Sequence, residues 1–319
     1  MLTNWTTHRI DARLGRQSTM VAPLRSTPFR FALSALCAAV LTACGGSAPD
    51  SGLVSSDSTA SSKTLTAVHV SSTTTSSSAW TPAVNDTWQW QLRGQINTGY
   101  AVNVYDIDLF DAPQSTIDSL KAQGRHVVCY FSAGSSENWR PDFNQFLASD
   151  KGNALSGWAG ERWLDTRSAN VRQIMQKRLD LAKAKGCDGV EPDNVDGYTN
   201  DPGFPLNAST QLDYNRFLAA EAHARGLVVA LKNDVEQVEE LAAYFDFAIN
   251  EQCHQYQECD VYTAFTDQGK PVFNAEYAKK YRDNVNGART GLCQAARSAD
   301  IRTLVLPLYL DDKFRYSCD

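Results

Sequence analysis

From residue 80 onward, short hydrophobic runs alternate with longer segments in which apolar residues recur at helical spacing. Two of these segments, 168–186 and 209–226, end on a glycine, which is typical of a helix end. Alternation of strands and helices predicts a parallel sheet covered by helices. The runs expected to form strands are 103–110, 126–134, 161–165, 188–194, 227–234, 247–252, 271–277 and 303–310.

Eight strand–helix units within residues 80–319 predict a (β/α)8 TIM barrel that forms a single catalytic domain. A doubly wound sheet is the alternative, but no glycine-rich phosphate loop follows the first strand, which argues against a nucleotide-binding version. The run at 88–92 lies too close to 103–110 for a helix between them. We therefore expect one of the two to be an extra strand or part of a first hairpin.

The N-terminal segment has the pattern of an export signal. An apolar stretch at 29–44 follows two arginines and is shorter than the roughly 20 residues that span a bilayer. It ends in Leu-Thr-Ala-Cys-Gly at 41–45, which resembles the bacterial lipobox, where the cysteine is lipidated and becomes the new N-terminus. The pattern predicts a lipoprotein signal peptide over 1–43 with Cys44 as the first mature residue. A conventional signal in which Cys44 has no role is the alternative.

Residues 45–78 are mostly Ser, Thr, Ala and Gly. Such a segment cannot bury a core and predicts a flexible linker. We expect an exported, membrane-anchored lipoprotein that faces the periplasm or the cell exterior. Its contact with the membrane would be through the lipid alone, and we expect a monomer.

Composition is that of an ordinary globular protein, with 43% hydrophobic and 21% charged residues among 319. The formal charge is −6. Removing residues 1–43 takes away five arginines and one aspartate, which leaves 25 basic and 35 acidic residues and a charge of −10. This balance argues against nucleic acid as a partner and is compatible with a cationic substrate.

Nearly every predicted strand ends in a polar or ionisable side chain. Strand ends are often polar because they are solvated, but in a barrel they meet at one mouth, where catalytic groups lie. Their recurrence after apolar runs therefore favours a site. The residues are Asp106, Asp108, Tyr130, Ser132, Asp165, Glu191, Asp193, Lys232, Asn233, Glu251, Glu276, Tyr277, Tyr309 and Asp311.

The densest polar motif is CDGVEPDNVDGY at 187–198. Glu191 and Asp193 are two residues apart, so their side chains share one face of a strand. By strand order Asp193 ends the fourth strand and Glu251 the sixth. Two carboxylates that face one cleft are the minimum machinery of glycoside hydrolysis, in which one must hold a proton at neutral pH.

Other uses of these groups are less well supported. Clustered carboxylates can bind a hard cation, but five histidines and no HExxH spacing give little support for a metal site. The sequence lacks a GxSxG elbow, which argues against an acyl-transfer hydrolase. We expect neither a metal nor a cofactor.

Eight motifs in order resemble glycoside hydrolase family 114, the endo-α-1,4-polygalactosaminidases. They are WQWQL, YDIDLFD, VCYFSAGSSENWRPD, RWLD, DGVEPDNVDGY, LKN, FAINEQC…EC and FNAEY, and they span about 80–316. The resemblance implies a (β/α)8 barrel that cleaves α-1,4-linked galactosaminan, a cationic amino-sugar polysaccharide. It also implies Asp193 and Glu251 as the catalytic pair, with Asp193 as nucleophile and Glu251 as acid/base. Glu191 is the alternative nucleophile.

The resemblance also suggests substrate contacts. Asp106, Asp108, Asp165 and Glu276 are candidate ligands for the ammonium groups of galactosamine. Tyr130, Trp139 and Tyr277 are candidate sugar platforms, with packing in the core or at the rim as the alternative for each. Ser132, Glu191, Asn194, Lys232 and Asn233 complete the candidate set, and we expect Asp193 or Glu191 to pair with Lys232. The rival functions are a hydrolase of another glycan and a surface-tethered glycan-binding protein without turnover.

Export permits disulfides. Cys253 and Cys259 bracket a short loop directly after Glu251, so we expect a bridge that stiffens this loop, with separate burial as the alternative. A second expected bridge, Cys293–Cys318, would tie down the C-terminus. Cys129 and Cys187 lie in strand interiors and are predicted to be small buried side chains.

Overall fold

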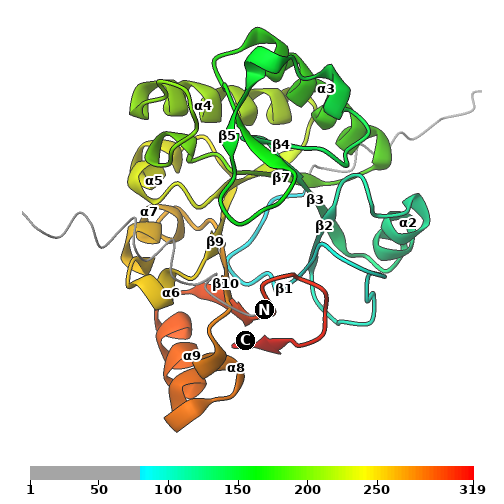
Figure 1. Ribbon diagram of the computed structural model, residues 1–319. Coiled ribbons are helices and arrows are strands. Elements are labelled where there is room, and N and C mark those ends of the chain that lie inside the picture. The colour runs from blue at the N-terminus through cyan, green and yellow to red at the C-terminus, as the bar shows by residue number, and fades with distance from the viewer. Residues whose placement is uncertain (1–79) are drawn as a thin grey trace, which may run out of the picture. The chain divides into compact units, whose positions relative to one another are not determined.

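The computed structural model describes residues 80–319, shown in colour in Figure 1. The predicted signal peptide 1–43, the lipidated Cys44 and the linker 45–78 lie outside the described residues. Among residues 80–319, none of the helices combines the length and the apolar character needed to cross a membrane.

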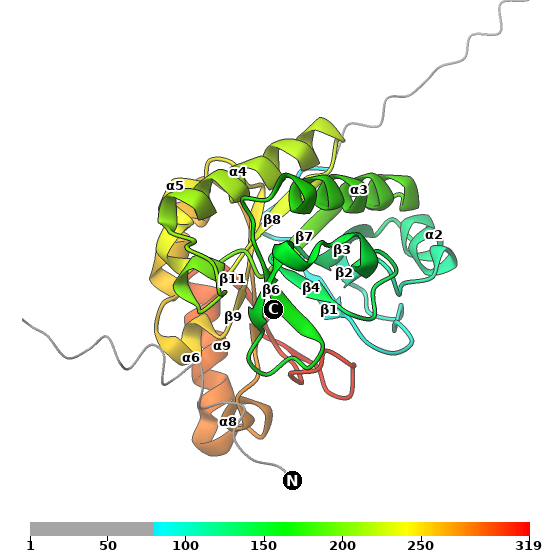
Figure 2. The same ribbon diagram turned by 45° about the horizontal axis from the view of Figure 1, so that its top comes forward.

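The centre of the fold is a curled sheet of parallel strands with helices around its outside (Figures 1 and 2). In spatial order the strands are β1 (Trp88–Gln91), β2 (Val104–Asp108), β3 (His126–Ser132), β7 (Gly189–Asp193), β8 (Val228–Lys232), β9 (Phe247–Glu251), β10 (Val272–Glu276) and β11 (Ile301–Val305). The short β12 (Tyr316–Ser317) adds to β11 in the antiparallel sense. The helices are α2 (Gln114–Ala122), α3 (Ala169–Lys185), α4 (Ala208–Ala224), α5 (Val238–Leu241), α6 (Cys253–Tyr256), α7 (Thr263–Thr266), α8 (Lys279–Arg282) and α9 (Ala288–Ser298).

The first and last parallel strands, β1 and β11, lie next to each other. The Trp88 indole Nε1 donates to the Arg302 carbonyl at 3.0 Å. The Arg315 guanidinium, beside β12, donates to the Trp88 carbonyl at 2.9 Å. Side chains therefore join the two edges of the curled sheet, and the predicted (β/α)8 barrel is confirmed.

Two details of the strand prediction were wrong. The run at 88–92 supplies the first barrel strand, because β1 pairs with β2 in parallel and is joined to it without a helix. The run at 161–165 is not a barrel strand. Its residues form β6 (Glu161–Leu164), which lies between β4 (Ser135–Glu137) and β5 (Lys151–Ala154) in a small antiparallel sheet inserted after β3. The first error leaves out one barrel strand and the second adds one, so the predicted strand numbers still hold: β7 is the fourth barrel strand and β9 the sixth.

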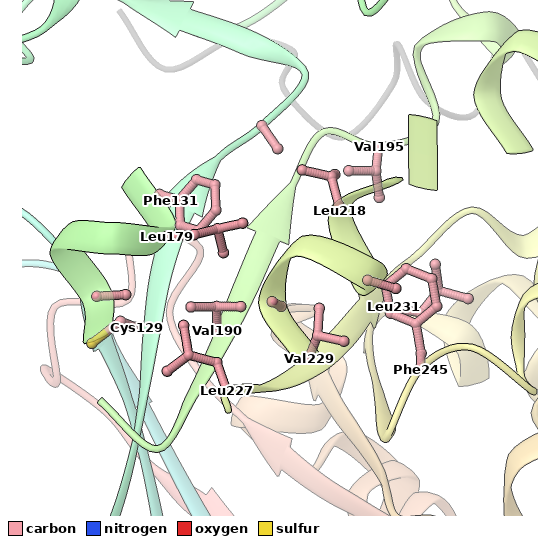
Figure 3. Close-up of a cluster of buried hydrophobic side chains, with 14 of the residues drawn as sticks. Cys129, Phe131, Leu179, Val190, Val195, Leu218, Leu227, Val229, Leu231 and Phe245 are labelled. Atoms are coloured by element: carbon pink, nitrogen blue, oxygen red, sulfur yellow. The ribbon is translucent and has the colours of Figure 1, made fainter. Parts of the chain in front are cut away.

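Two apolar layers hold the barrel together. Strand residues such as Phe131, Val190 and Val229 pack outward against Leu179 and Leu218 of the helices (Figure 3). The alternate positions fill the barrel interior, where Trp88 stacks on Phe273 with ring centroids 5.0 Å apart. The interior cluster consists of Trp88, Trp90, Val104, Val128, Ala230, Phe247, Ile249, Phe273, Ala275, Leu304, Leu306 and Leu310.

Local signals explain where α3 and α4, the two longest helices within residues 80–319, stop. Gly186 follows α3 with φ of 80°, and Gly226 closely follows α4 with φ of 66°. Only glycine adopts this left-handed conformation without a steric penalty, and it ends a helix by satisfying its last carbonyls. The two helix ends predicted at glycines are confirmed.

The domain contains three disulfides. The expected bridges Cys253–Cys259 and Cys293–Cys318 are both present. The prediction that Cys129 and Cys187 are separate buried thiols was wrong, because they form the third bridge. This bridge ties β3 to the segment between α3 and β7. The strands β3 and β7 are neighbours in the sheet but distant in sequence.

Candidate active site

Lys232 is the centre of a ring of carboxylates at the carboxyl ends of the strands. Its ammonium Nζ lies 3.0 Å from Glu191 Oε1, 3.0 Å from Asp193 Oδ1 and 3.5 Å from Glu251 Oε2. The ammonium also lies 4.7 Å from the ring centroid of Trp90, which closes the barrel interior beneath it. Burial alone would lower the pKa of Lys232, but the charges of Asp193, Glu191 and Glu251 raise it well above its ordinary value. Lys232 is therefore an ammonium ion, and its expected pairing with Asp193 or Glu191 is confirmed for both.

The shared ammonium limits the distance between Asp193 and Glu251. Their nearest oxygens cannot be further apart than the two contacts to Nζ placed end to end, which is about 6.5 Å. Both carboxylates keep some exposed surface, 18% of the Asp193 side chain and 17% of the Glu251 side chain. The structure thus brings the predicted pair to one end of the barrel, where solvent reaches both.

Three neighbours hold the Asp193 carboxylate. Besides Lys232 on Oδ1, the Tyr130 hydroxyl donates to Oδ2 at 3.1 Å, and Asn194 Nδ2 lies 3.4 Å from the same oxygen. Burial, followed by the charge of Asp193, raises the pKa of Tyr130 well above its ordinary value, so the phenol stays protonated as a donor. The side chain of Asp193 is therefore fixed in orientation.

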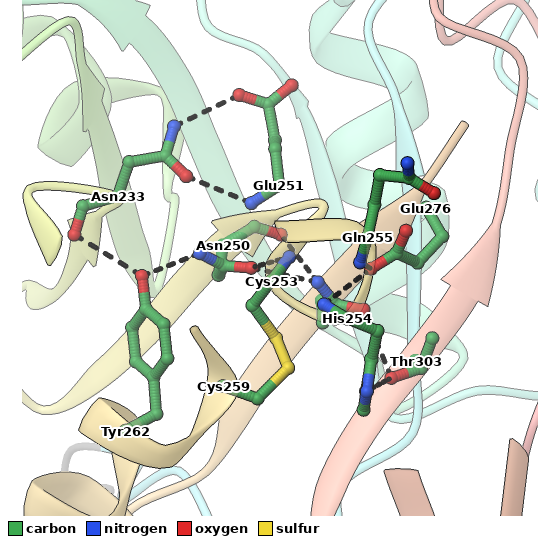
Figure 4. The surroundings of a disulfide bond; sticks show 11 residues. Asn233, Asn250, Glu251, Cys253, His254, Gln255, Cys259, Tyr262, Glu276 and Thr303 are labelled. Atoms are coloured by element: carbon green, nitrogen blue, oxygen red, sulfur yellow. Dashed lines mark hydrogen bonds between the residues drawn. A yellow bond between two sulfur atoms is a disulfide. The ribbon is translucent and has the colours of Figure 1, made fainter. Parts of the chain in front are cut away.

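Glu251 is held from the two strands beside its own. Asn233, just after β8, donates from Nδ2 to Glu251 Oε2 at 3.1 Å and accepts the Glu251 backbone N–H at 2.9 Å (Figure 4). The Tyr277 hydroxyl, just after β10, donates to Oε1 at 2.7 Å. Asn233 has φ of 49°, a left-handed conformation that asparagine tolerates better than most residues. Both oxygens of Glu251 thus carry a hydrogen bond.

Glu191 and Asp106 lie deeper than this pair. Glu191 has no exposed surface, and Asp106 is also buried. Burial, with the neighbouring charge of Glu191, raises the pKa of Asp106 well above its ordinary value. Burial likewise raises the pKa of Glu191 to about 7, although Lys232 opposes this. Burial therefore favours the protonated form of both carboxyl groups.

Asp108 is not available to a substrate. Both of its oxygens accept from the Arg140 guanidinium, at 2.9 and 2.5 Å, and Arg140 also binds Glu137. The prediction of Asp108 as an ammonium ligand is therefore corrected. Trp139 is 48% exposed, with its ring centroid 6.0 Å from the Arg140 guanidinium carbon rather than among the carboxylates around Lys232.

Asp165 and Glu276 bind partners outside the carboxylate ring. Asp165 follows β6 in the inserted sheet and pairs with Arg167 at 2.8 Å. Glu276 accepts the backbone N–H groups of His254 and Gln255 at 2.9 and 3.3 Å, at the start of α6 (Figure 4). Side chains alternate between the two faces of a strand, which explains the position of Glu276. Tyr277 points to the mouth of the barrel, so Glu276, the residue before it, faces the helices. The prediction of a substrate contact is corrected for Glu276, which is fully buried, and that for Asp165 stays a prediction.

The sequence reasoning overlooked several residues of the site. Trp90, whose ring lies against Lys232, was hidden in a run that had no assigned place in the barrel. Arg140 was not expected to occupy Asp108, because nothing in the spacing of two residues 32 positions apart indicates their contact.

Tyr309 and Asp311 lie in the loop after β11, where Tyr309 contacts Arg93 and Asp311 contacts Lys313.

One cluster within residues 80–319 has the composition of a metal site. One ligand atom each of Cys253, His254 and Cys259 lie within 4.8 Å of one another. The two cysteines are joined in a disulfide and so offer no thiolate, the form that binds metals. This cluster therefore stiffens the loop after Glu251.

Comparison with known proteins agrees with this geometry. The profile of glycoside-hydrolase family GH114 matches residues 69–319. The crystal structure of Aspergillus fumigatus Ega3 in complex with galactosamine is 44% identical, with a TM-score of 0.70, and the match covers 75% of this chain and 97% of that one. The glycoside hydrolase domain of PelA from Pseudomonas aeruginosa, 17% identical, shares the fold with a TM-score of 0.56 over 72% of this chain and 97% of that one. An uncharacterized protein of Deinococcus radiodurans is 26% identical over 179 residues, which are 50% of this chain and 58% of that protein.

Proposed function

Since the chain belongs to glycoside-hydrolase family GH114, we propose that it is an endo-acting hydrolase of α-1,4-linked, galactosamine-containing polysaccharide, with Asp193 and Glu251 as its catalytic pair. The observation that carries this proposal is the pair of partly exposed carboxylates that share one buried ammonium. The likeness to Ega3, whose structure contains galactosamine, supports the choice of sugar.

Asp193 is the nucleophile of this proposal. Its carboxylate oxygen would attack the anomeric carbon while Glu251 gives its proton to the glycosidic oxygen of the departing sugar. Glu251 would then take a proton from a water whose oxygen attacks the anomeric carbon, and the bond from that carbon to Asp193 breaks. Glu191, the alternative nucleophile, is fully buried beneath Lys232, and a substrate carbon has no access to it.

We propose that the reaction retains the anomeric configuration. Retaining enzymes place their carboxyl groups about 5–5.5 Å apart, and inverting enzymes about 6.5–9.5 Å. The nearest oxygens of Asp193 and Glu251 lie within about 6.5 Å of each other, a limit that includes the retaining distance. Product configuration, read by proton NMR immediately after cleavage, tests this.

The charge of the site supports an amino sugar as substrate. Four carboxyl groups, those of Asp106, Glu191, Asp193 and Glu251, are near the one ammonium of Lys232. A protonated galactosamine would offset the excess negative charge of these carboxyl groups, whereas an anionic sugar would increase that charge.

We also propose export as a lipoprotein. The three disulfides of residues 80–319 support an oxidising compartment. Cys44 would carry the lipid, and residues 45–78 would separate the enzyme from the membrane.

The experiment is a comparison of substrates and variants. Protein without residues 1–44 is incubated with galactosaminan, chitosan and a neutral galactan, and new reducing ends and product sizes are measured. Galactosaminan should be cut internally, and Asp193→Asn and Glu251→Gln should each abolish cleavage while still binding the polymer. Glu239→Gln, at an exposed glutamate of α5, is the matched control and should cleave normally.

Two results would contradict the proposal. Faster cleavage of chitosan or of the neutral glycan would favour a hydrolase of another specificity. Binding of galactosaminan without cleavage of any glycan would favour a glycan-binding protein.

A further inference from the structure

A chain of buried hydrogen bonds leads from Asp193 into the inserted sheet. Asn194 Nδ2 donates to Ser132 Oγ at 2.9 Å. The hydroxyls of Ser132 and Ser135 are 2.7 Å apart, and Ser135 Oγ donates to Glu161 Oε2 at 2.7 Å. Ser132, Ser135 and Glu161 are all buried, so water does not compete for these bonds.

The acceptor at the far end sets the direction of every bond in this chain. Each hydroxyl has one proton to donate, and that of Ser135 goes to Glu161. Ser132 must therefore donate to Ser135, which leaves Ser132 Oγ free only to accept. The group of Asn194 that faces Ser132 must then be its NH2 and not its carbonyl oxygen, because the identity of an amide's two ends follows from its hydrogen-bond network.

This orientation matters for Asp193. The same Asn194 nitrogen lies 3.4 Å from Asp193 Oδ2, so its second N–H is directed toward the carboxylate. A flipped amide would instead place the lone pairs of an oxygen against a negative charge. Asn194 is thus a donor to Asp193 only while Ser132 accepts from it.

The backbone of the same segment holds Asp193 from its other side. The N–H groups of Ala133 and Gly134 donate to the Asp193 carbonyl at 2.8 and 3.0 Å. Gly134 packs so closely on Asn194 that a Cβ there would lie 1.7 Å from the Asn194 carbonyl oxygen. Asn194 itself has φ of 60°. The segment 132–135 therefore positions both the main chain and the side chain of the proposed nucleophile.

We propose that Glu161 is a positioning residue for Asp193, acting through Ser135, Ser132 and the amide of Asn194. The inference rests on the proposed function, because it assigns Glu161 a role in that reaction. Glu161 does not touch the substrate; it keeps the Asn194 amide turned so that it donates to the nucleophile. The inserted sheet is thereby part of the catalytic machinery.

Because Glu161 can be protonated, its positioning role should make kcat depend on pH. Burial, with the charges of Glu137 and Asp193, raises the pKa of Glu161 to about 7, against the Ser135 hydrogen bond and the charge of Arg140. Below that pH a protonated Glu161 can donate to Ser135 and reverse the chain. The wild-type kcat should then fall on the acid side with this pKa, and Glu161→Gln should lack that step.

The test measures kcat and KM for Ser135→Ala, Glu161→Ala, their double variant and Glu161→Gln in the full chain. Each alanine variant should lower kcat by roughly 10-fold to 100-fold with little change in KM, since positioning rather than binding is lost. The double variant should lose no more than either single variant, because both act through one chain. Glu161→Gln should recover part of the lost kcat, because its carbonyl oxygen still accepts from Ser135.

Ser136→Ala is the matched control. It removes the same atom from the neighbouring buried residue of β4, whose hydroxyl donates to the Arg162 carbonyl and not to this chain. Equal kcat losses in Ser136→Ala and Ser135→Ala, or additive losses in the double variant, would overturn the inference.

A crystal structure of the Ser135→Ala variant separates this inference from the proposed function. We expect the Asn194 side chain to turn away from Asp193 in it. An unchanged Asn194 would overturn the positioning role whatever the substrate. A wild-type protein that cleaves no glycan would overturn the proposed function, while the Asn194 result would still decide the positioning role.

Discussion

At the scale of single residues, Lys232 determines how close the acidic groups of the site can be. One ammonium contacts Glu191, Asp193 and Glu251, and these carboxylates would repel one another without it. A buried charge is tolerated when it is paired and becomes costly when a partner is removed. The stability of this part of the domain and the geometry of the proposed catalytic pair therefore depend on the same side chain.

Lys232→Met should lower the free energy of unfolding by about 3–5 kcal/mol, because it leaves a buried carboxylate without its counter-charge. It should also lower kcat at least about 100-fold, since the pair loses its common anchor. Denaturant unfolding and initial rates measure the two effects. The double variant Lys232→Met/Glu191→Met should recover stability but not activity. A single variant with normal kcat would show that Lys232 is not needed for the arrangement of the pair.

At the scale of elements, two of the disulfides have different roles. Cys129–Cys187 closes a long stretch of chain, with a sequence separation of 58, between β3 and β7. Cys253–Cys259, with a separation of 6, stiffens the turn that follows Glu251. In the chain-entropy account a longer loop gives a larger stabilisation, about 4 kcal/mol for the first bridge and about 2 kcal/mol for the second.

Replacing Cys129 and Cys187 by alanine should therefore reduce stability more than replacing Cys253 and Cys259. The reverse order should hold for kcat, because the second bridge lies in the turn directly after Glu251. Urea unfolding and initial rates on one substrate measure both. Equal effects of the two replacements on kcat would contradict a role for the Cys253–Cys259 turn in orienting Glu251.

Glu276 links the start of α6 to β10 and makes this element sensitive to pH. Burial raises its pKa from the ordinary 4.5 to about 7, against the backbone N–H groups of His254 and Gln255. Because the folded state holds the proton more tightly than the unfolded state, this residue's contribution to stability is lost as pH rises from about 4.5 to about 7.

Glu276→Gln keeps an oxygen that accepts both backbone N–H groups but cannot ionise. Relative to wild type, the variant should gain up to about 3 kcal/mol in free energy of unfolding between pH 4.5 and pH 8. Urea unfolding of both proteins at the two pH values measures this difference. Glu239→Gln on α5 is the control and should show no such gain. A difference between Glu276→Gln and wild type that does not change with pH would show that Glu276 is not held protonated.

At the scale of the whole molecule, negative charges outnumber positive charges. The chain without residues 1–43 carries −10, and the described active site holds more carboxylates than cations. Such a field raises the local concentration of a cationic polymer near the mouth of the barrel. The attraction acts through solvent and is screened over about 8–10 Å at physiological ionic strength.

Binding of galactosaminan to the inactive Glu251→Gln variant should therefore weaken as salt is added, by roughly 10-fold between low and physiological ionic strength. The same polymer after full N-acetylation lacks the charge and serves as the control. Its affinity should change little with salt. Equal salt dependence of the two polymers would show that ammonium groups do not contribute to recognition.

The sequence by itself determined the fold class and two of the disulfides, and it placed Asp193 and Glu251 on the fourth and sixth strands only because two errors in the strand count cancel. The fold class follows from helix and strand periodicity and from glycine at helix ends, and the Cys253–Cys259 bridge follows from the short spacing of its cysteines. It could not decide which run, 88–92 or 161–165, belongs to the barrel, because both have the pattern of a short strand and only pairing with neighbours tells them apart.

Only the tertiary structure decided which polar side chains gather around Lys232. Asp108 and Glu276 end strands just as Asp193 does, yet an arginine or a pair of backbone N–H groups from elsewhere in the chain occupies each of them. The same holds for Glu161, whose path to Asp193 runs through two serines of segment 132–135 and through Asn194. Contacts between residues far apart in sequence depend on packing in three dimensions, and the spacing of residues along one chain does not contain that information.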